Sequence, residues 1–265
     1  MVCNIHKSRN SYKHMQIVIS PKYQVSYDFV LQIPIIFNVE GETVYQGRNT
    51  IKRFKTSNGE WIVKRYKKPN IIQRIAYTFF KKSKAERAYL YAQKLQSKNI
   101  CTPEGIAYIE EKKYGLIRDC YFISTSCDAP TLYPTLGGND DYDPCLAGSL
   151  AAFFMELHQK EFLHGDPNLN NILFRKDKNG DFQFVVIDTN RSVFKPSPSK
   201  QECLHNLMRI THNRELLKYI TLRYAILRGW NTGESVNIVM KALHRFEKRN
   251  KIKQAIKKKF FLFKH

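Results

Sequence analysis

This sequence of 265 residues has few acidic residues and no long apolar run. It contains 23 Asp and Glu against 44 Lys and Arg, which gives a formal net charge of +21 at pH 7. No stretch approaches the roughly eighteen consecutive apolar residues of a membrane-spanning helix, and the first ten residues lack the apolar core of a signal peptide. We therefore expect a protein that is neither secreted nor membrane-spanning, and whose charge favours a polyanionic partner.

The six cysteines are scattered along the chain without any Cys-x-x-Cys pair or nearby histidine pattern. The sequence therefore predicts neither a zinc site nor a disulfide framework, and we expect reduced thiols. Apolar residues make up 43% of the chain, which is ample for a hydrophobic core. These features are typical of a cytoplasmic globular protein with one large domain or two lobes.

The most informative stretch runs from residue 163 to residue 191. Asp166 closes a His-Gly-Asp sequence after an apolar helical run, Asn171 follows five residues later, and an apolar strand ends on Asp188. Transfer of a γ-phosphoryl group needs a carboxylate that accepts the proton of the acceptor hydroxyl, and oxygen ligands that hold Mg²⁺ on the phosphates. The pattern predicts a phosphotransferase with Asp166 as the catalytic base and Asn171 and Asp188 as metal ligands.

The same residue types are also ordinary turn formers. Asp166-Pro167-Asn168 alone is consistent with a structural turn, and Asn179-Gly180 predicts a hairpin between strands at residues 171–174 and 182–188 on either interpretation. We favour the catalytic interpretation because a polar Asp188 at the end of an apolar strand coincides with the other features, whereas a lone His-x-Asp would be a weak signal.

Residues 163–191 resemble the catalytic loop and metal-binding strand of eukaryotic-type kinases, in the His-Gly-Asp version of small-molecule kinases. The chain most resembles the Kdo/heptose kinases of lipopolysaccharide biosynthesis. The resemblance implies an α+β, bilobal protein-kinase-like fold. Residues 1–126 would form a small nucleotide-binding lobe with an antiparallel sheet and one main helix, and residues 127–265 a mainly helical catalytic lobe with a basic C-terminal tail. It also implies ATP and Mg²⁺ as cofactors.

Two positions depart from the protein-kinase pattern. Gly165 replaces the Arg that usually stands between His and Asp, and Thr189-Asn190 replaces the Phe-Gly that follows the metal-binding Asp. Without that Arg, no obvious residue is present to bind the phosphate of a phosphorylated activation loop, which disfavours a protein kinase. We expect His164 to hold the loop in place and not to take part in the chemistry.

Lys64 and Glu86 fit the nucleotide-binding lobe that the resemblance implies. Lys64 matches the third-strand lysine of kinases that contacts the α and β phosphates, and Glu86 is its natural partner in an ion pair. Each residue has a structural alternative. Lys64 could be a solvent-facing strand residue, and Glu86, three positions after Ser83, could complete a capping box at the start of a helix.

The strands of this lobe are less clearly defined by the sequence. Residues 16–38 are strand-like, although Pro34 interrupts them. Residues 46–49 lie where kinases have a glycine-rich phosphate loop, but they contain only one glycine. Backbone amides in a tight turn can still approach phosphate, so we expect nucleotide contact there, with charge from Arg48 or Lys52. Three further strands are expected at residues 39–45, 50–55 and 60–66, the last two joined by the Asn58-Gly59 hairpin.

Two basic regions adjoin apolar side chains. Residues 67–87 hold seven cations and one acid, and residues 245–265 hold nine Lys or Arg and one Glu. Cations beside exposed aromatic residues favour an anionic membrane surface. The alternatives are a solvated face with a disordered tail, and a nucleic-acid partner. Because no nucleic-acid fold signature is visible, we expect no nucleic acid.

The resemblance implies ATP-dependent phosphorylation of a hydroxyl on the inner core of lipopolysaccharide, on Kdo, heptose or another lipid A-linked sugar. We expect the enzyme to lie peripherally on the cytoplasmic face of the inner membrane. One rival is a kinase of the same fold that acts on protein or on a soluble small molecule. The other is a polyanion-binding pseudokinase, which the presence of Lys64, Asp166, Asn171 and Asp188 argues against.

Overall fold

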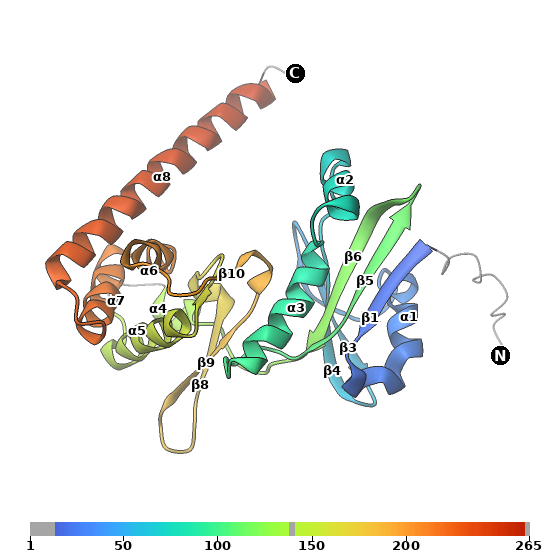
Figure 1. Cartoon of the computed structure of the whole chain (residues 1–265), viewed down its shortest axis with the longest axis horizontal. Helices are drawn as coiled ribbons and strands as arrows, with labels where there is room; N and C mark the ends of the chain where they lie inside the picture. Colours follow the sequence, from blue (N-terminus) through green and yellow to red (C-terminus); the bar gives the residue numbers. More distant parts are fainter. Residues whose placement is uncertain (1–13, 138–140, 263–265) are drawn as a thin grey trace. The chain divides into compact units, whose positions relative to one another are not determined.

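The computed structural model describes residues 14–137 and 141–262, with side chains up to residue 256. The chain divides into two compact units, residues 1–128 and residues 129–265. In Figure 1 the first unit runs from blue to green and contains the large sheet, while the second runs on to red and is mainly helical. The predicted α+β class is confirmed.

A six-stranded antiparallel sheet forms the centre of the first unit, with strand order β1-β5-β6-β4-β3-β2. Strands β3 and β4 meet at the predicted Asn58-Gly59 turn, where Gly59 has a φ of +98°. The strands are β1 (Met15–Ile19), β2 (Glu42–Gln46), β3 (Thr50–Thr56), β4 (Gly59–Arg65), β5 (Gly105–Lys113) and β6 (Leu116–Thr125); the helices are η2 (Pro21–Ser26), α1 (Tyr27–Ile36), α2 (Ile71–Phe79) and α3 (Lys84–Ser97).

The segment between β1 and β2 is helical, so the strand-like prediction for residues 16–38 is wrong beyond β1. Val30, Ile33 and Phe37 are fully buried at helical spacing. This apolar stripe outweighs the β-branched composition of the segment, because one helix face can bury all three side chains against the sheet. Pro34 lies inside α1, where it removes one backbone hydrogen bond without ending the helix.

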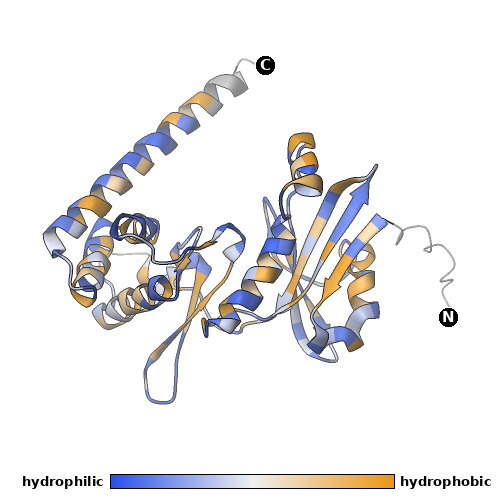
Figure 2. Cartoon of the chain, in the orientation of Figure 1, coloured by the Kyte–Doolittle hydropathy of each residue, from blue (hydrophilic) through white to orange (hydrophobic). Residues whose placement is uncertain are grey.

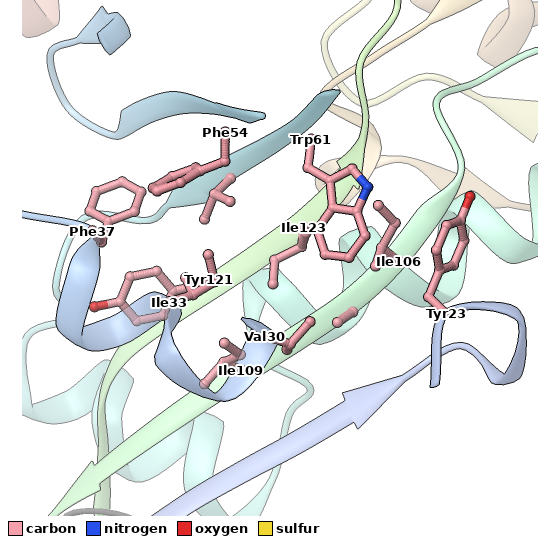
Figure 3. Close-up of a cluster of buried hydrophobic side chains, with 12 residues drawn as sticks. Tyr23, Val30, Ile33, Phe37, Phe54, Trp61, Ile106, Ile109, Tyr121 and Ile123 are labelled. Carbon is pink, nitrogen blue, oxygen red and sulfur yellow. The ribbon is translucent and has the colours of Figure 1, made fainter. Parts of the chain in front are cut away.

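Helix α1 covers one face of the sheet and completes the larger core of the first unit. Its apolar stripe packs against Trp61, Ile109 and Ile123, which are fully buried (Figure 3). The ring of Tyr23 meets the ring of Trp61 edge to face, with the ring centres 5.9 Å apart. Burying each side chain of this size stabilises the fold by about 1.5–3 kcal/mol, so this core holds the central strands together.

Helix α3 packs on the opposite face of the sheet. Ala85, Ala88 and Tyr89 of α3 form a buried cluster with side chains of β5 and β6. Successive side chains of a strand point to opposite faces. Because Trp61 and Val63 face α1, their neighbour Lys64 lies on the face that carries α3.

Helix α2 is held to the sheet by polar contacts. The Arg74 guanidinium donates to the carbonyl of Ile117 at 3.0 Å, and the Thr78 hydroxyl accepts from the Ile117 N–H at 3.0 Å. No residue of α2 is buried. Its apolar side chains therefore lie at the surface, and α2 is largely orange in Figure 2.

The second unit combines helices with two small sheets. Strands β8 and β9 form the predicted hairpin around Asn179-Gly180, and β7 pairs with β10. Asp143 caps α5 and Pro144 occupies its first turn. The elements are α4 (Tyr133–Leu136), α5 (Pro144–Gln159), β7 (Phe162–Leu163), η3 (Leu169–Asn171), β8 (Ile172–Lys176), β9 (Phe182–Val186), η4 (Thr189–Arg191), β10 (Val193–Phe194), α6 (Lys200–Leu207), α7 (Arg214–Leu227) and α8 (Thr232–Leu262).

Helices α5 and α7 form the centre of this unit. Leu150 and Phe154 of α5 and Ile220 of α7 are fully buried. The first part of α8 packs on α6 and α7, whereas every described side chain of α8 beyond Asn250 is exposed. The basic C-terminal region is thus an exposed helix from residue 251 to residue 256, and its side chains after residue 256 lie outside the described part.

No helix of the described residues is both long enough and apolar enough to span a membrane. Five cysteines are free thiols, and the sixth, Cys3, lies outside the described residues.

Candidate active site

The His-Gly-Asp loop of the second unit is fixed by the ring of His164. Its Nε2 lies 3.0 Å from the Ile187 carbonyl oxygen, and its Nδ1 lies 3.0 Å from the backbone nitrogen of Asp166. A carbonyl only accepts hydrogen bonds, so Nε2 carries the proton and Nδ1 accepts from the Asp166 N–H. Burial lowers the pKa of His164 and outweighs the opposing effect of the nearby Asp166 and Asp188 carboxylates. His164 therefore stays neutral and joins the loop to the end of β9.

Gly165 lies against the backbone of Arg191, which leaves no room for a side chain. A Cβ atom at this position would lie 2.2 Å from the Arg191 carbonyl oxygen and 2.3 Å from the Arg191 carbonyl carbon. The Gly165 N–H also donates to the Ser192 hydroxyl at 3.1 Å. No side chain fits between these two backbone segments, which explains why the Arg of protein kinases is absent here.

The Asp166 carboxylate is about one third exposed, so it is accessible to a substrate. Its Oδ1 accepts from the Asn168 side chain at 3.2 Å and lies 3.7 Å from the Arg209 guanidinium. These two contacts restrict the orientation of the Asp166 carboxylate. The arrangement suits a base that must meet a hydroxyl in a defined direction.

Asn171 ties the loop to the strand that leads to Asp188. Its side-chain nitrogen donates to the Asp166 carbonyl at 2.9 Å, and its own carbonyl accepts from the Ile187 N–H at 3.0 Å. Asp188 adopts the left-handed conformation, with φ 55° and ψ 46°, and accepts from the Asn190 side chain at 2.5 Å. A non-glycine residue in this region is uncommon and often functional. The structure thus brings Asp166, Asn171 and Asp188 together.

The donor atoms of Asn171 and Asp188 fit a magnesium ion. The bond from the Asn171 nitrogen leaves its amide oxygen without a hydrogen-bond partner among the described residues. Asp188 adds a carboxylate at the end of β9. Mg²⁺ prefers such oxygen ligands and takes only one or two from the protein, with phosphates and water completing its shell. Within the described residues, no group of three or more His, Cys, Asp or Glu could hold a metal.

A buried polar network supports the loop from below. The Asn206 side chain donates to the His164 carbonyl at 2.7 Å and accepts from His158 Nε2 at 3.1 Å. His158 Nδ1 in turn accepts from the Tyr224 hydroxyl at 2.8 Å. Helices α5, α6 and α7 each contribute one member, so the His-Gly-Asp loop is bonded to the helical core.

Lys64 and Glu86 lie in the first unit. Lys64 is on β4, paired with Phe122 of β6, and Phe122 packs against the α3 cluster. Glu86 is in the first turn of α3, where Ser83 accepts from its backbone N–H at 3.1 Å. The Glu86 carboxylate pairs with Lys82 at 2.8 Å, so it does not complete the predicted capping box. The predicted pairing of Lys64 with Glu86 stays a prediction.

The turn at residues 46–49 joins β2 and β3, as expected for the position of a phosphate loop. Arg48 lines a cationic cavity of about 370 Å³ together with Arg65 and Lys67. Lys52 points to the α1 face instead, where its ammonium group donates to the Glu40 carbonyl at 2.7 Å. Of the two candidate cations, Arg48 is therefore the one in the turn region.

Sequence reasoning missed Arg209, Asn206 and His158. Arg209 and Asn206 contact the loop from more than forty residues further along the chain, and His158 contacts Asn206. None of the three has a characteristic spacing from Asp166. The helical pattern of residues 200–207 shows that α6 has a buried side but does not show which polar residue lies under the loop.

Two comparisons bear on this site. Residues 139–224 match the model of the lipopolysaccharide kinase (Kdo/WaaP) family. This range contains the loop, Asp188 and Asn206. The chain is also similar to a solved structure of WaaP in complex with acyl carrier protein, with 12% identity, a TM-score of 0.55, and coverage of 88% of this chain and 97% of that one. A search of curated proteins found no match.

The fold of this protein is kinase-like. At 12% identity the structural match shows the fold alone, and it confirms the predicted kinase-like fold. The family match covers the segment that carries the predicted base and metal ligands. Residues 139–224 are similar to the lipopolysaccharide kinase (Kdo/WaaP) family, in agreement with the resemblance that the sequence indicated.

Replacing Gly165 with Ala should destabilise the protein and impair phosphate transfer. The added Cβ would collide with the Arg191 backbone, which cannot move away as a flexible side chain could. Overpacking of this kind costs about 1–3 kcal/mol. Urea unfolding of the two purified proteins measures the loss.

Gly148→Ala is the matched control. A Cβ at Gly148 in α5 would meet its nearest neighbour, the Arg223 side chain, at an ordinary 3.8 Å. Alanine also favours a helix over glycine by about 1 kcal/mol. We expect equal or greater stability for this variant. Equal stability of Gly165→Ala and the parent protein would contradict the close approach.

Acidification should destabilise the second unit through His158. Burial lowers the pKa of His158 from 6.5 to about 4. The unfolded chain therefore binds a proton at a higher pH than the folded chain, and stability present above pH 6.5 is lost as the pH falls towards 4. The contribution is on the order of 3 kcal/mol.

Circular dichroism during urea unfolding, repeated across this pH range, measures the effect. His158→Gln, which cannot gain a proton, should be less stable at neutral pH but lose less stability on acidification. The same pH dependence in parent and variant would show that His158 is not the group responsible.

Proposed function

We propose that this protein is an ATP- and Mg²⁺-dependent kinase that phosphorylates a sugar hydroxyl of the lipopolysaccharide inner core, on Kdo or heptose. The observation that carries the proposal is the joint positioning of Asp166, Asn171 and Asp188 by His164 and the backbone of β9. The family match supports the acceptor class.

In this proposal Asp166 accepts the proton of the acceptor hydroxyl. As the hydroxyl oxygen bonds to the γ-phosphorus of ATP, the bond between that phosphorus and the β–γ bridging oxygen breaks, and ADP leaves. Asn171 and Asp188 would hold Mg²⁺, which would neutralise charge on the phosphates when bound. Lys64 and Glu86 of the first unit position the nucleotide. Neutral His164 maintains the loop and transfers no proton.

Two rivals make different predictions. A kinase for protein or for a soluble molecule would leave the lipopolysaccharide core unchanged, and a pseudokinase would bind polyanions without turnover. Mass spectrometry of the core from cells with and without the gene distinguishes them. We expect the deletion to remove the mass of one phosphate group, which expression of the parent protein restores. An unchanged core, with phosphate lost from a protein, would favour the protein-kinase rival.

Asp166→Asn should slow phosphate transfer by about 10²–10⁴-fold, because the amide has nearly the same shape but cannot accept the proton. Binding of Mg-ATP should persist, since Asn171 and Asp188 are unchanged. The assay uses purified protein, radiolabelled ATP and a deacylated core oligosaccharide.

Asp177→Asn is the control for loss of one carboxylate. Asp177 lies in the turn between β8 and β9, where its Oδ1 accepts from the backbone of Asn179 and Asp181. We expect this variant to transfer phosphate at the parent rate. An Asp166→Asn protein as fast as the parent would refute the base assignment.

We further propose that α2 docks the enzyme on an anionic membrane. Ile72, Phe79 and Phe80 are 75%, 66% and 79% exposed. A helix of a soluble protein usually buries its apolar side, whereas Arg74 holds α2 to the sheet by polar bonds and leaves the apolar side outward. Exposed lysines flank the helix at positions 67, 68, 81 and 82. Apolar insertion and attraction to anionic lipid can therefore act together.

Exchanging both Ile72 and Phe79 for Ser should weaken vesicle binding by roughly tenfold or more, because each side chain loses apolar burial. Flotation with phosphatidylglycerol vesicles at low and high salt measures this, and binding of the parent should fall at high salt. Val25→Ser removes another exposed apolar residue of the first unit and should bind normally. Equal flotation of all three proteins would exclude α2 as the anchor.

Acyl carrier protein is a second candidate partner, because the similar WaaP structure contains it. Gel filtration of this protein mixed with acyl carrier protein tests for a complex. Repeating it with the Ile72 and Phe79 double variant shows whether α2 takes part.

A further inference from the structure

A cavity of about 380 Å³ adjoins the catalytic base within the second unit. Asp166 and Asn168 of the catalytic loop form one side, and Arg209 and His212 form another. Phe246 of α8 also lines it. The volume falls in the range of small-molecule sites, which typically combine aromatic surface with a few polar groups.

The cavity lies beside the base and not beside the metal ligands. Asp166 lines it, but neither Asn171 nor Asp188 does. A base in phosphoryl transfer must contact the acceptor hydroxyl, while the metal ligands contact the phosphates of the donor. A space that reaches the base without reaching the metal ligands is therefore suited to the acceptor.

Arg209 is the cationic group of this cavity. Its guanidinium lies 3.7 Å from Asp166 Oδ1, which is an ion pair but too long for a hydrogen bond. It also lies over the Phe246 ring, 5.6 Å from the ring centre. Among the described residues the guanidinium has no hydrogen-bond partner, and it is 36% exposed. A guanidinium held in this way matches a carboxylate or phosphate, which can take two parallel hydrogen bonds from it.

Phe246 is a fixed wall of the cavity. Its ring stacks on the His212 ring at an interplanar angle of 28°. Glu247, the next residue of α8, accepts from His212 at 3.0 Å and from Arg214 at 2.7 Å. These contacts join α8 to the segment after α6. Phe246 therefore holds the Arg209 guanidinium and the His212 ring at the wall of the cavity.

We propose that this cavity holds the acceptor sugar and that Arg209 binds an anionic substituent close to the hydroxyl that Asp166 deprotonates. The proposal rests on the proposed function, since it assumes that Asp166 is the base of a sugar kinase. It adds that the acceptor must carry a carboxylate or phosphate near the reacting hydroxyl. Arg209 is then a specificity-determining residue.

The test compares the parent protein with Arg209→Gln and Arg209→Lys. The acceptors are a deacylated core oligosaccharide, the same oligosaccharide with its carboxylates reduced to alcohols, and a dephosphorylated sample. Deacylation removes any effect of membrane binding. We expect Arg209→Gln to raise the acceptor KM by roughly 10- to 100-fold, as for loss of hydrogen bonds to a charged group. The KM for ATP should stay within twofold, and Arg209→Lys should be intermediate.

The modified oligosaccharides test the inference without relying on a variant. Removal of the anionic group that Arg209 binds should raise the acceptor KM of the parent protein. The parent and Arg209→Gln should then have the same acceptor KM. Whether reduction or dephosphorylation has this effect identifies the group. Lys218→Gln removes an exposed cation of α7 outside the cavity and should keep the parent acceptor KM.

The failures of the two proposals are distinguishable. If the parent transfers phosphate to none of the oligosaccharides, the proposed function is refuted. If the parent transfers phosphate but Arg209→Gln, folded by circular dichroism, has an unchanged acceptor KM, the cavity proposal is overturned. A raised KM for ATP alone would also overturn it, because Arg209 would then serve the transferred phosphoryl group.

Discussion

The ring of His164 is the constraint on which the candidate site depends. It holds the Ile187 carbonyl and the Asp166 N–H at 3.0 Å each, and both bonds need the neutral ring with its proton on Nε2. A protonated ring would lose its acceptor at Nδ1. Burial, which lowers the pKa of His164, therefore preserves the geometry of the loop. The same bonds place the end of β9, and with it Asp188, beside Asp166.

The surrounding residues make this arrangement rigid. Gly165 allows the Arg191 backbone to cross the loop, and Asn171 links the loop to β9 by a side-chain bond and a backbone bond. Asn206 connects the loop to the buried His158. Preorganisation of this kind favours catalysis, because the charged groups do not have to rearrange during the reaction.

Local sequence predicted the parts of the site that are close in the chain. Asp166, Asn171 and Asp188 belong to one loop and one hairpin, whose turn and strand signals are strong. The long-range contacts were not predictable: Arg209 reaches Asp166 only because α6 ends beside the loop. The helix α1 was missed because its β-branched residues and Pro34 favour a strand, whereas burial against the sheet decides its structure.

We propose that Asn171 and Asp188 hold the metal of a phosphate donor while Asp166 faces the acceptor. A crystal structure with Mg²⁺ and a non-hydrolysable ATP analogue tests it most directly. We expect Mg²⁺ to be coordinated by oxygens of Asn171 and Asp188 and of the nucleotide phosphates, with the Asp166 carboxylate directed to the cavity at Arg209. A nucleotide whose metal lies away from Asn171 and Asp188 would contradict it.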